Sequence, residues 1–311
     1  MTRVSSSLTA ALAIVLLFAG QAVAGDSGKG VQRMVNFGGS CKGCSLAGRK
    51  LTGASFSGGD FSNASLVGSD LRGASFVGVR FANADFTRAD LRSASLLSPN
   101  FANAMFVDAR MEGVQGAAAN FSDANLKRAN LSAAELVSAN FSRASLSDTR
   151  LVGAALQNAM FIGADCQHAD FRNADLTNAQ LVHGKFNDSS FRSAVMDNAN
   201  LAGGQFANVD FRGASLERAI LSGGQFPRAD FRGASLDGAL LFGVDLSDAR
   251  GLDQDQLDDA CGDASTRLPP GLTMRACHGR PEGRRMFSVH IPAIPAVPAV
   301  PPVPAVPAWQ R

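Results

Sequence analysis

The residues of this 311-residue chain best suited to chemistry are its five cysteines. Cys41 and Cys44 form a C-x-x-C motif, which in a redox enzyme lies at the N-terminus of a helix within a βαβ unit. Neither feature is indicated here, so we predict a structural pair, either oxidised or simply buried. A zinc site would need two further thiols close by. Since none stands beside this motif, we predict no metal there.

The remaining cysteines and the histidines also favour structural roles. Cys261 and Cys277 lie at the far end of the chain, and outside the cytoplasm we expect them to form a disulfide. Cys166 occupies an apolar position of a repeat and is predicted to be a small buried hydrophobe. His168 and His183 fall on outward positions three faces apart, so they cannot share a metal. With no nucleophile–base pair, phosphate loop or ligand cluster, we predict no catalytic residue, cofactor or metal site.

Cys166, His168 and His183 lie within a five-residue repeat that runs from Leu46 to Leu246 without a slip. Of the 41 positions at this spacing, 20 are Leu, 17 are Phe and two are Met, and the exceptions are Gly116 and Cys166. Two residues before these positions the residue is Ala in 27 cases. No amphipathic helix or simple strand has this period. A unit with one large and one small apolar side chain cannot bury them alone, so neighbouring units must stack.

The units Ala-Asn-Leu-Ser-Ala at 129–133 and Ala-Asp-Phe-Arg-Gly at 229–233 closely resemble those of the pentapeptide-repeat family. The resemblance covers about two-thirds of the chain and implies an all-β solenoid, a right-handed quadrilateral β-helix with four units per coil. Independent support for twenty residues per coil comes from 206–225 and 226–245, which match at 11 of 20 positions. The repeats then make about ten coils, a rod of about 50 Å with Phe rings stacked in columns. At Gly116 we expect a local bulge or an inserted neighbour.

Outside the repeat, the composition divides the chain into further segments. Residues 1–24 have the pattern of a secretory signal peptide, so we expect an exported, periplasmic or secreted protein cleaved near Ala24–Gly25, with no transmembrane segment. A lead-in at 25–40 precedes the repeat domain at 41–250. In the tail at 288–311 proline recurs every third residue, the period of a polyproline II helix. This tail is interpreted as a disordered spacer or, alternatively, as a docking segment.

The segment at 251–287 is predicted to be a short helical C-terminal cap, because an open solenoid must cover its end. Asp253 can act as the N-cap with Gln256 as its capping-box partner, and Leu252 can pack on Leu257. Gly262 offers a stop for the helix. Residues 251–263 include five acidic residues and no basic ones, whereas residues 264–311 include six basic residues and a single acidic one, Glu282. This asymmetry of charge suggests self-association through the cap or docking of the tail onto the cap.

The outward-facing residues of the repeat include one regular charged surface, which we call the arginine wall. Its arginines lie at multiples of twenty residues and therefore on a single face, with aspartates beside them. The arginines are Arg72, Arg92, Arg172, Arg192, Arg212 and Arg232, and the aspartates are Asp70, Asp90, Asp170, Asp210 and Asp230. Stacked arginines about 5 Å apart would repel one another unless neutralised. The wall is interpreted either as a solvated ladder of weak ion pairs or as a charged surface for a partner.

Charge narrows the possible functions. Some members of the family act in the cytoplasm as DNA mimics that bind type II topoisomerases, and such a mimic needs a dense negative surface. Residues 41–250 carry 20 basic and 20 acidic residues, which disfavours this role and also a nucleic-acid partner. We therefore expect an exported, non-enzymatic scaffold with protein partners. The alternative from another class is an envelope enzyme with a site in the irregular cap, between 251 and 290.

Overall fold

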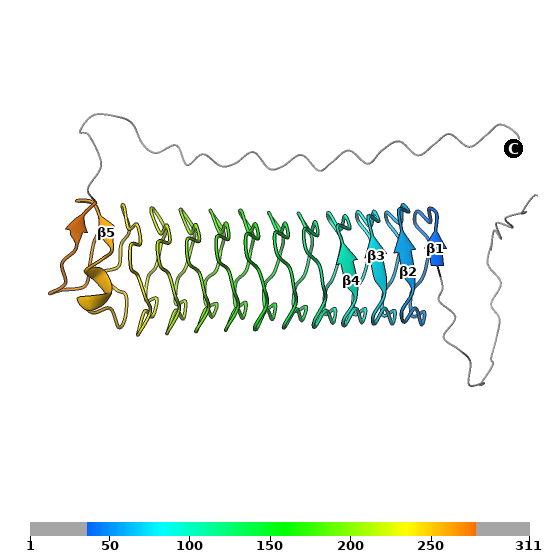
Figure 1. Ribbon diagram of the computed structural model, residues 1–311, viewed down its shortest axis with the longest axis horizontal. Coiled ribbons are helices and arrows are strands. Elements are labelled where there is room, and N and C mark those ends of the chain that lie inside the picture. The colour runs from blue at the N-terminus through cyan, green and yellow to red at the C-terminus, as the bar shows by residue number, and fades with distance from the viewer. Residues whose placement is uncertain (1–35, 278–311) are drawn as a thin grey trace, which may run out of the picture.

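The computed structural model describes residues 36–277. The predicted signal peptide at 1–24, most of the lead-in and the proline-rich tail at 288–311 lie outside the described residues. Figure 1 shows the described part as an elongated stack of coils, with β1 (Asn36–Gly38) at one end and β5 (Cys261–Gly262) at the other. No helix within 36–277 is long and apolar enough to cross a membrane.

The stack is held together by parallel backbone pairing between consecutive coils. At its N-terminal end, β1 is followed by β2 (Ser55–Ser57), β3 (Ser75–Val77) and β4 (Ser95–Leu97), which form one parallel sheet in the order β1-β2-β3-β4. On the other sides of these coils, and on every side of the later coils, single parallel bridges pair residues twenty apart, from Ser45↔Ser65 to Asp230↔Arg250. Since the repeat has five residues and the pairing returns after twenty, each coil has four sides, as the sequence predicted.

Each side of a coil has the same local structure. The Leu or Phe of the unit and the small residue two positions before it point into the core, and the residue between them points out. The second residue after the Leu or Phe turns the corner with a positive φ, as at Asn63 (φ 60°) and Gly73 (φ 62°). Glycine and asparagine adopt this left-handed conformation at little cost, so corner chemistry explains much of their use in the repeat.

Phenylalanine columns fill the core as the twenty-residue spacing predicts. In the column from Phe61 to Phe161, ring centroids of successive coils lie 5.0–5.7 Å apart. A second column, Phe171 to Phe231, has spacings of 4.7–5.5 Å. Offset stacking of this kind adds to the stabilisation from apolar burial. Cys166 lies in the same core and is fully buried, as predicted.

Gly116 leaves a core position without a side chain, and its neighbours occupy the space. A Cβ built at Gly116 would lie 2.9 Å from Cδ2 of Leu136 and 3.4 Å from Cβ of Leu96. The backbone ladder continues, because the Gly116 N–H donates to the Glu135 carbonyl at 2.7 Å. Of the two expectations for this site, the inserted neighbour is found and the bulge is not.

The predicted helical cap is wrong in its secondary structure. Asp253 and Gln256 do exchange the expected capping-box hydrogen bonds, at 2.9 and 3.0 Å, and Leu257 is buried. However, the turn they start is a single 3-10 turn, η1 (Asp255–Leu257). Gly262, expected to stop a helix, lies instead in β5, which pairs in parallel with β6 (Arg275–Ala276).

The open end of the solenoid explains why this turn stays short. The Gln256 side-chain amide donates to the carbonyl of Phe231 at 2.8 Å and to that of Ala234 at 2.7 Å, which are acceptors of the last coil. The chain then returns to the stack, where Cys261 pairs with Leu240. One 3-10 turn and renewed strand pairing thus supply the last coil with hydrogen-bond partners that a longer helix would draw away.

Candidate functional site

The arginine wall is built from identical units along one corner of the solenoid. In each of five coils the aspartate at the centre of a side accepts hydrogen bonds from the arginine two residues later. In the coil of Arg172, Nε donates to Oδ1 of Asp170 at 2.8 Å and Nη2 donates to Oδ2 at 2.7 Å. The same two-point contact occurs in the pairs Asp70–Arg72, Asp90–Arg92, Asp210–Arg212 and Asp230–Arg232.

The backbone fixes each aspartate as well. The Arg212 backbone N–H donates to Oδ1 of Asp210 at 3.0 Å, so the carboxylate spans the start of the corner turn. Asp210 and Asp230 are directly paired in adjacent coils, and Nε of Arg212 lies 4.0 Å from Oδ2 of Asp230. The predicted ladder of ion pairs is therefore present, with each pair closed mainly within its own coil.

Electrostatics follow from this geometry. The hydrogen bond from the Arg232 guanidinium holds the pKa of the Asp230 carboxyl below its usual range. Arg212 lowers the pKa of Asp210 in the same way, although the neighbouring Asp230 charge opposes the shift. These carboxylates stay ionised and paired, so their arrangement presents a fixed pattern of charge and does not prepare a proton donor or acceptor.

Arg192 departs from the pattern of the wall. Ser190 stands where the other five coils have aspartate. Within residues 36–277, the Arg192 guanidinium has no ion pair or hydrogen bond. Arg172, Asn173, Arg192 and Ser193 line a shallow pocket of about 260 Å³. The sequence interpretation placed Arg192 correctly on the wall but treated it as neutralised like the rest, and the missing aspartate at 190 was the signal available.

Among the ion pairs that the sequence did not predict, two join corners of adjacent coils. Nε of Arg128 donates to Oδ1 of Asp108 at 2.7 Å, and Nε of Arg143 donates to Oδ1 of Asp123 at 2.7 Å. Both pairs have a spacing of twenty residues, so opposite charges one coil apart would have revealed them. They lie on other corners than the arginine wall and leave it a separate surface.

The cysteines lie at the two ends of the described chain. Cys41 and Cys44 form a disulfide whose Cα atoms are 5.4 Å apart, at the mouth of the first coil. Cys261 and Cys277 form another, with Cα atoms 4.9 Å apart, which ties β5 to the end of the described chain. Burial raises the pKa of the Cys166 thiol well above its usual value. None of these sulfurs lies beside the wall.

The histidines lie where the sequence placed them, on separate corners of the surface. His168 and His183 turn corners with φ of 57° and 56° and are exposed. No group of three His, Cys, Asp or Glu side chains suited to a metal ion occurs between residues 36 and 277.

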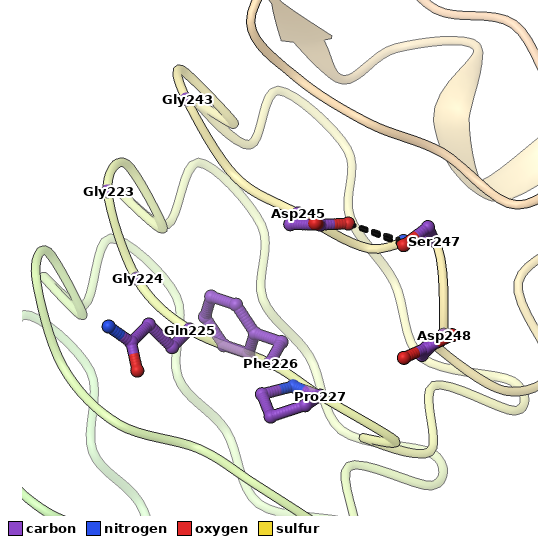
Figure 2. Close-up of a pocket in the computed structure, with 9 residues that line it drawn as sticks. All are labelled: Gly223, Gly224, Gln225, Phe226, Pro227, Gly243, Asp245, Ser247 and Asp248. Carbon is purple, nitrogen blue, oxygen red and sulfur yellow. Dashed lines mark hydrogen bonds between the residues drawn. The ribbon is translucent and has the colours of Figure 1, made fainter.

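A second hollow lies near the C-terminal end of the stack (Figure 2). It has a volume of about 430 Å³ and lies between Gly223–Pro227 and the next coil at Gly243–Asp248. In the preceding coil the Phe206 N–H donates to the Gln225 carbonyl at 2.7 Å, and Gln225 in turn forms a parallel bridge with Asp245 of the next coil. The Asp245 carboxylate accepts from the Ser247 hydroxyl at 2.6 Å, as the dashed line marks. The hollow thus lies beside Pro227, between two coils whose backbones remain paired.

Comparison with known families identifies the repeat itself. A family model described as pentapeptide repeats matches eight copies at residues 40–76, 74–113, 100–132 and 139–178. A second, described as a pentapeptide repeat region, matches residues 164–241. Together they span nearly all of the coils. A comparison with curated proteins finds no match.

Several solved structures are similar to this chain. HetL, a pentapeptide repeat protein involved in heterocyst differentiation regulation from the cyanobacterium Nostoc sp. strain PCC 7120, is 27% identical, with 74% of this chain and 90% of HetL covered and a TM-score of 0.49. Full-length QnrB1, a plasmid-mediated fluoroquinolone resistance protein, is 18% identical, with 75% and 93% covered and a TM-score of 0.19. Rfr23 from the cyanobacterium Cyanothece 51142 is 20% identical, with 50% and 90% covered and a TM-score of 0.21.

Proposed function

Because this chain belongs to the pentapeptide-repeat family, we propose that its solenoid is an exported, non-enzymatic scaffold that binds a protein partner through the arginine wall. The solenoid supplies a rigid support, since every coil is bonded to the next along its sides. The wall supplies the recognition surface. The proposal of export rests on the signal-peptide pattern at 1–24, and two disulfides suit an oxidising compartment.

One observation carries the choice of the wall over the other surfaces. In the coils from Asp170 to Arg232, four arginines follow one another at a single corner, and three of them are locked by two-point contacts with aspartate. Guanidinium groups held in this way lose little side-chain freedom when a partner binds. Preorganisation of that kind favours affinity, and arginine is enriched at protein interfaces.

Crosslinking of the exported protein in its own cells tests the proposal. The chain is compared with a variant in which Arg192, Arg212 and Arg232 are replaced by glutamate, and partners are identified by mass spectrometry. We expect the triple variant to recover its partner at least tenfold less well than the unmodified chain, because three positive charges become negative on one corner.

A matched variant controls for net charge. Arg128→Glu, Arg143→Glu and Arg218→Glu make the same change in charge at the other three corners of the solenoid. This control variant should recover the partner within twofold of the unmodified chain. Equal recovery by the wall variant and the unmodified chain would reject the wall as the binding surface. Retention of the full-length precursor in the cytoplasm would reject export.

A further inference from the structure

The wall has one place where its internal charges do not balance. At Arg72, Arg92, Arg172, Arg212 and Arg232 the aspartate two residues earlier takes up the guanidinium. At Arg192 the equivalent residue is Ser190, which has no charge and a side chain too short to reach across the corner. Arg192 is therefore the member of the wall whose five N–H donors find no acceptor among residues 36–277.

The neighbouring coil adds donors to the same place. Asp170 and Ser190 are paired across adjacent coils, and the rings of Phe171 and Phe191 stack at 4.7 Å beneath them. Arg172 and Arg192 are consequently held side by side. Arg172 uses Nε and Nη2 to bind Asp170, which leaves Nη1 free of the described hydrogen bonds.

The corner residues complete the pocket. The Asn173 N–H donates to the Arg192 carbonyl at 3.0 Å, so the corner at Asn173 lies directly against the next coil. Asn173 and Ser193 both have left-handed corner conformations, with φ of 57° and 56°. Both residues line the pocket with Arg172 and Arg192, and its volume of about 260 Å³ has room for a small oxyanion.

The surrounding charges favour an anion there. The backbone of Arg150, in the preceding coil, forms a parallel bridge with that of Asp170. The positive charges of Arg172 and Arg150 both lower the pKa of the Asp170 carboxyl. Asp170 is thus bound by Arg172 and also lies in the field of Arg150. Along this side of the three coils from 150 to 192, three arginines face one carboxylate, whereas the coils of Arg212 and Arg232 are balanced pair by pair.

We propose that Arg192 and Arg172, with Asn173 and Ser193, form an oxyanion site that receives an acidic group of the partner. The group has at least two oxygens, as in a carboxylate or a phosphate, and takes the place at Arg192 that aspartate takes in the other coils. Two-point binding of such oxygens is the contact for which a guanidinium is shaped. The inference rests on the proposed function, because it names the chemistry that the wall receives.

The purified mature protein tests the site directly, without the partner. Inorganic phosphate, sodium acetate and sodium chloride are titrated at matched ionic strength, and the Nε–Hε resonances of the arginines are followed by NMR. We expect a saturable shift for Arg192 with phosphate or acetate beyond that seen with chloride. Saturation with acetate as tight as with phosphate indicates a carboxylate group on the partner, and saturation with phosphate alone indicates a phosphate. Both results support an oxyanion site.

Variants separate this site from general attraction to the wall. Ser190→Asp supplies the missing internal partner and should weaken phosphate binding at least tenfold, as should Arg192→Ala. Ser190→Asn alters the size of the side chain without charge and should bind within twofold of the unmodified protein. Arg72→Ala removes the same charge from a paired arginine six coils away from Arg192 and should also bind within twofold.

The failures of the two proposals are distinguishable. Absence of any saturable shift beyond chloride, or phosphate binding by Ser190→Asp equal to that of the unmodified protein, overturns the oxyanion site while the role of the wall stands. Equal weakening by Arg72→Ala and Arg192→Ala overturns it too, because the attraction would then belong to the whole wall. Conversely, phosphate binding at Arg192 together with unchanged partner capture by the triple wall variant overturns the proposed function and leaves the site.

Discussion

The phenylalanine stack makes a quantitative prediction at Phe141. This ring is fully buried and lies between Phe121, at 5.1 Å and 4° from parallel, and Phe161, at 5.0 Å and 12° from parallel. Leucine occupies the same column further along, at Leu201, so Phe141→Leu keeps an apolar side chain suited to the position. It removes two stacked pairs, each worth about 0.5–1.5 kcal/mol beyond area burial, and should cost about 1–3 kcal/mol. Phe141→Ala also leaves a cavity and should cost about 3–5 kcal/mol.

Urea denaturation followed by circular dichroism measures this effect. The midpoint should fall for Phe141→Leu and fall further for Phe141→Ala, while the slope of the transition stays constant because the folded state buries similar surface. Leu201→Met is the matched control, since it conserves volume in the same column and removes no stacked pair, at a cost of less than about 1.5 kcal/mol. A midpoint for Phe141→Leu no lower than that of Leu201→Met would refute the stacking argument.

Four further predictions test other parts of the structure. Phe141→Tyr buries a hydroxyl in a core without polar partners and should lower the free energy of unfolding by about 1–3 kcal/mol, which lowers the urea midpoint. An unchanged midpoint would contradict a dry core. Gln256→Ala leaves two backbone carbonyls of the last coil without their side-chain donor and should cost about 1–3 kcal/mol in the same assay, whereas Gln225→Ala should be neutral. Arg232 lowers the pKa of Asp230, so this pair stabilises the fold fully above the unfolded-state pKa of about 3.9 and less as the pH falls through the folded-state pKa. Arg232→Gln should therefore narrow the difference between the urea midpoints measured at about pH 6 and about pH 2.5. An unaltered difference would count against the pair. Burial raises the pKa of the Cys166 thiol, so iodoacetamide should label Cys166 only when the protein is unfolded in urea. Labelling of Cys166 in the native protein at the same rate as in the unfolded protein would contradict its burial.

Much of the solenoid could be predicted because its repeat is strictly local and never slips. Leu46 to Leu246 specify which side chain of each unit is buried, and a period of twenty follows from the match between the coils at 206–225 and 226–245. The columns of phenylalanine and the shared corner of the arginines then follow from arithmetic. The capping-box partners Asp253 and Gln256 were also found, since that contact spans only three residues.

The extent of the cap could not be predicted in the same way. The sequence at 252–262 contains the start and stop signals of a helix, but it does not show that the last coil packs against this segment. In the structure the carbonyls of Phe231 and Ala234 need donors, and Gln256 provides them. Competition from backbone groups more than twenty residues away in sequence therefore decides how many turns form.

For the candidate site, the residues that share the wall can be identified from the sequence alone, because a twenty-residue spacing places arginines on one corner wherever the coil is regular. How their charges are satisfied depends on the folded structure. Each aspartate closes onto the arginine of its own coil, and Arg192 alone among the six wall arginines is left without a carboxylate. The spacing determines which corner each side chain faces. Which carboxylate an arginine binds depends on the reach of its side chain and on the atoms of the neighbouring coil, which come close only once the coils are stacked.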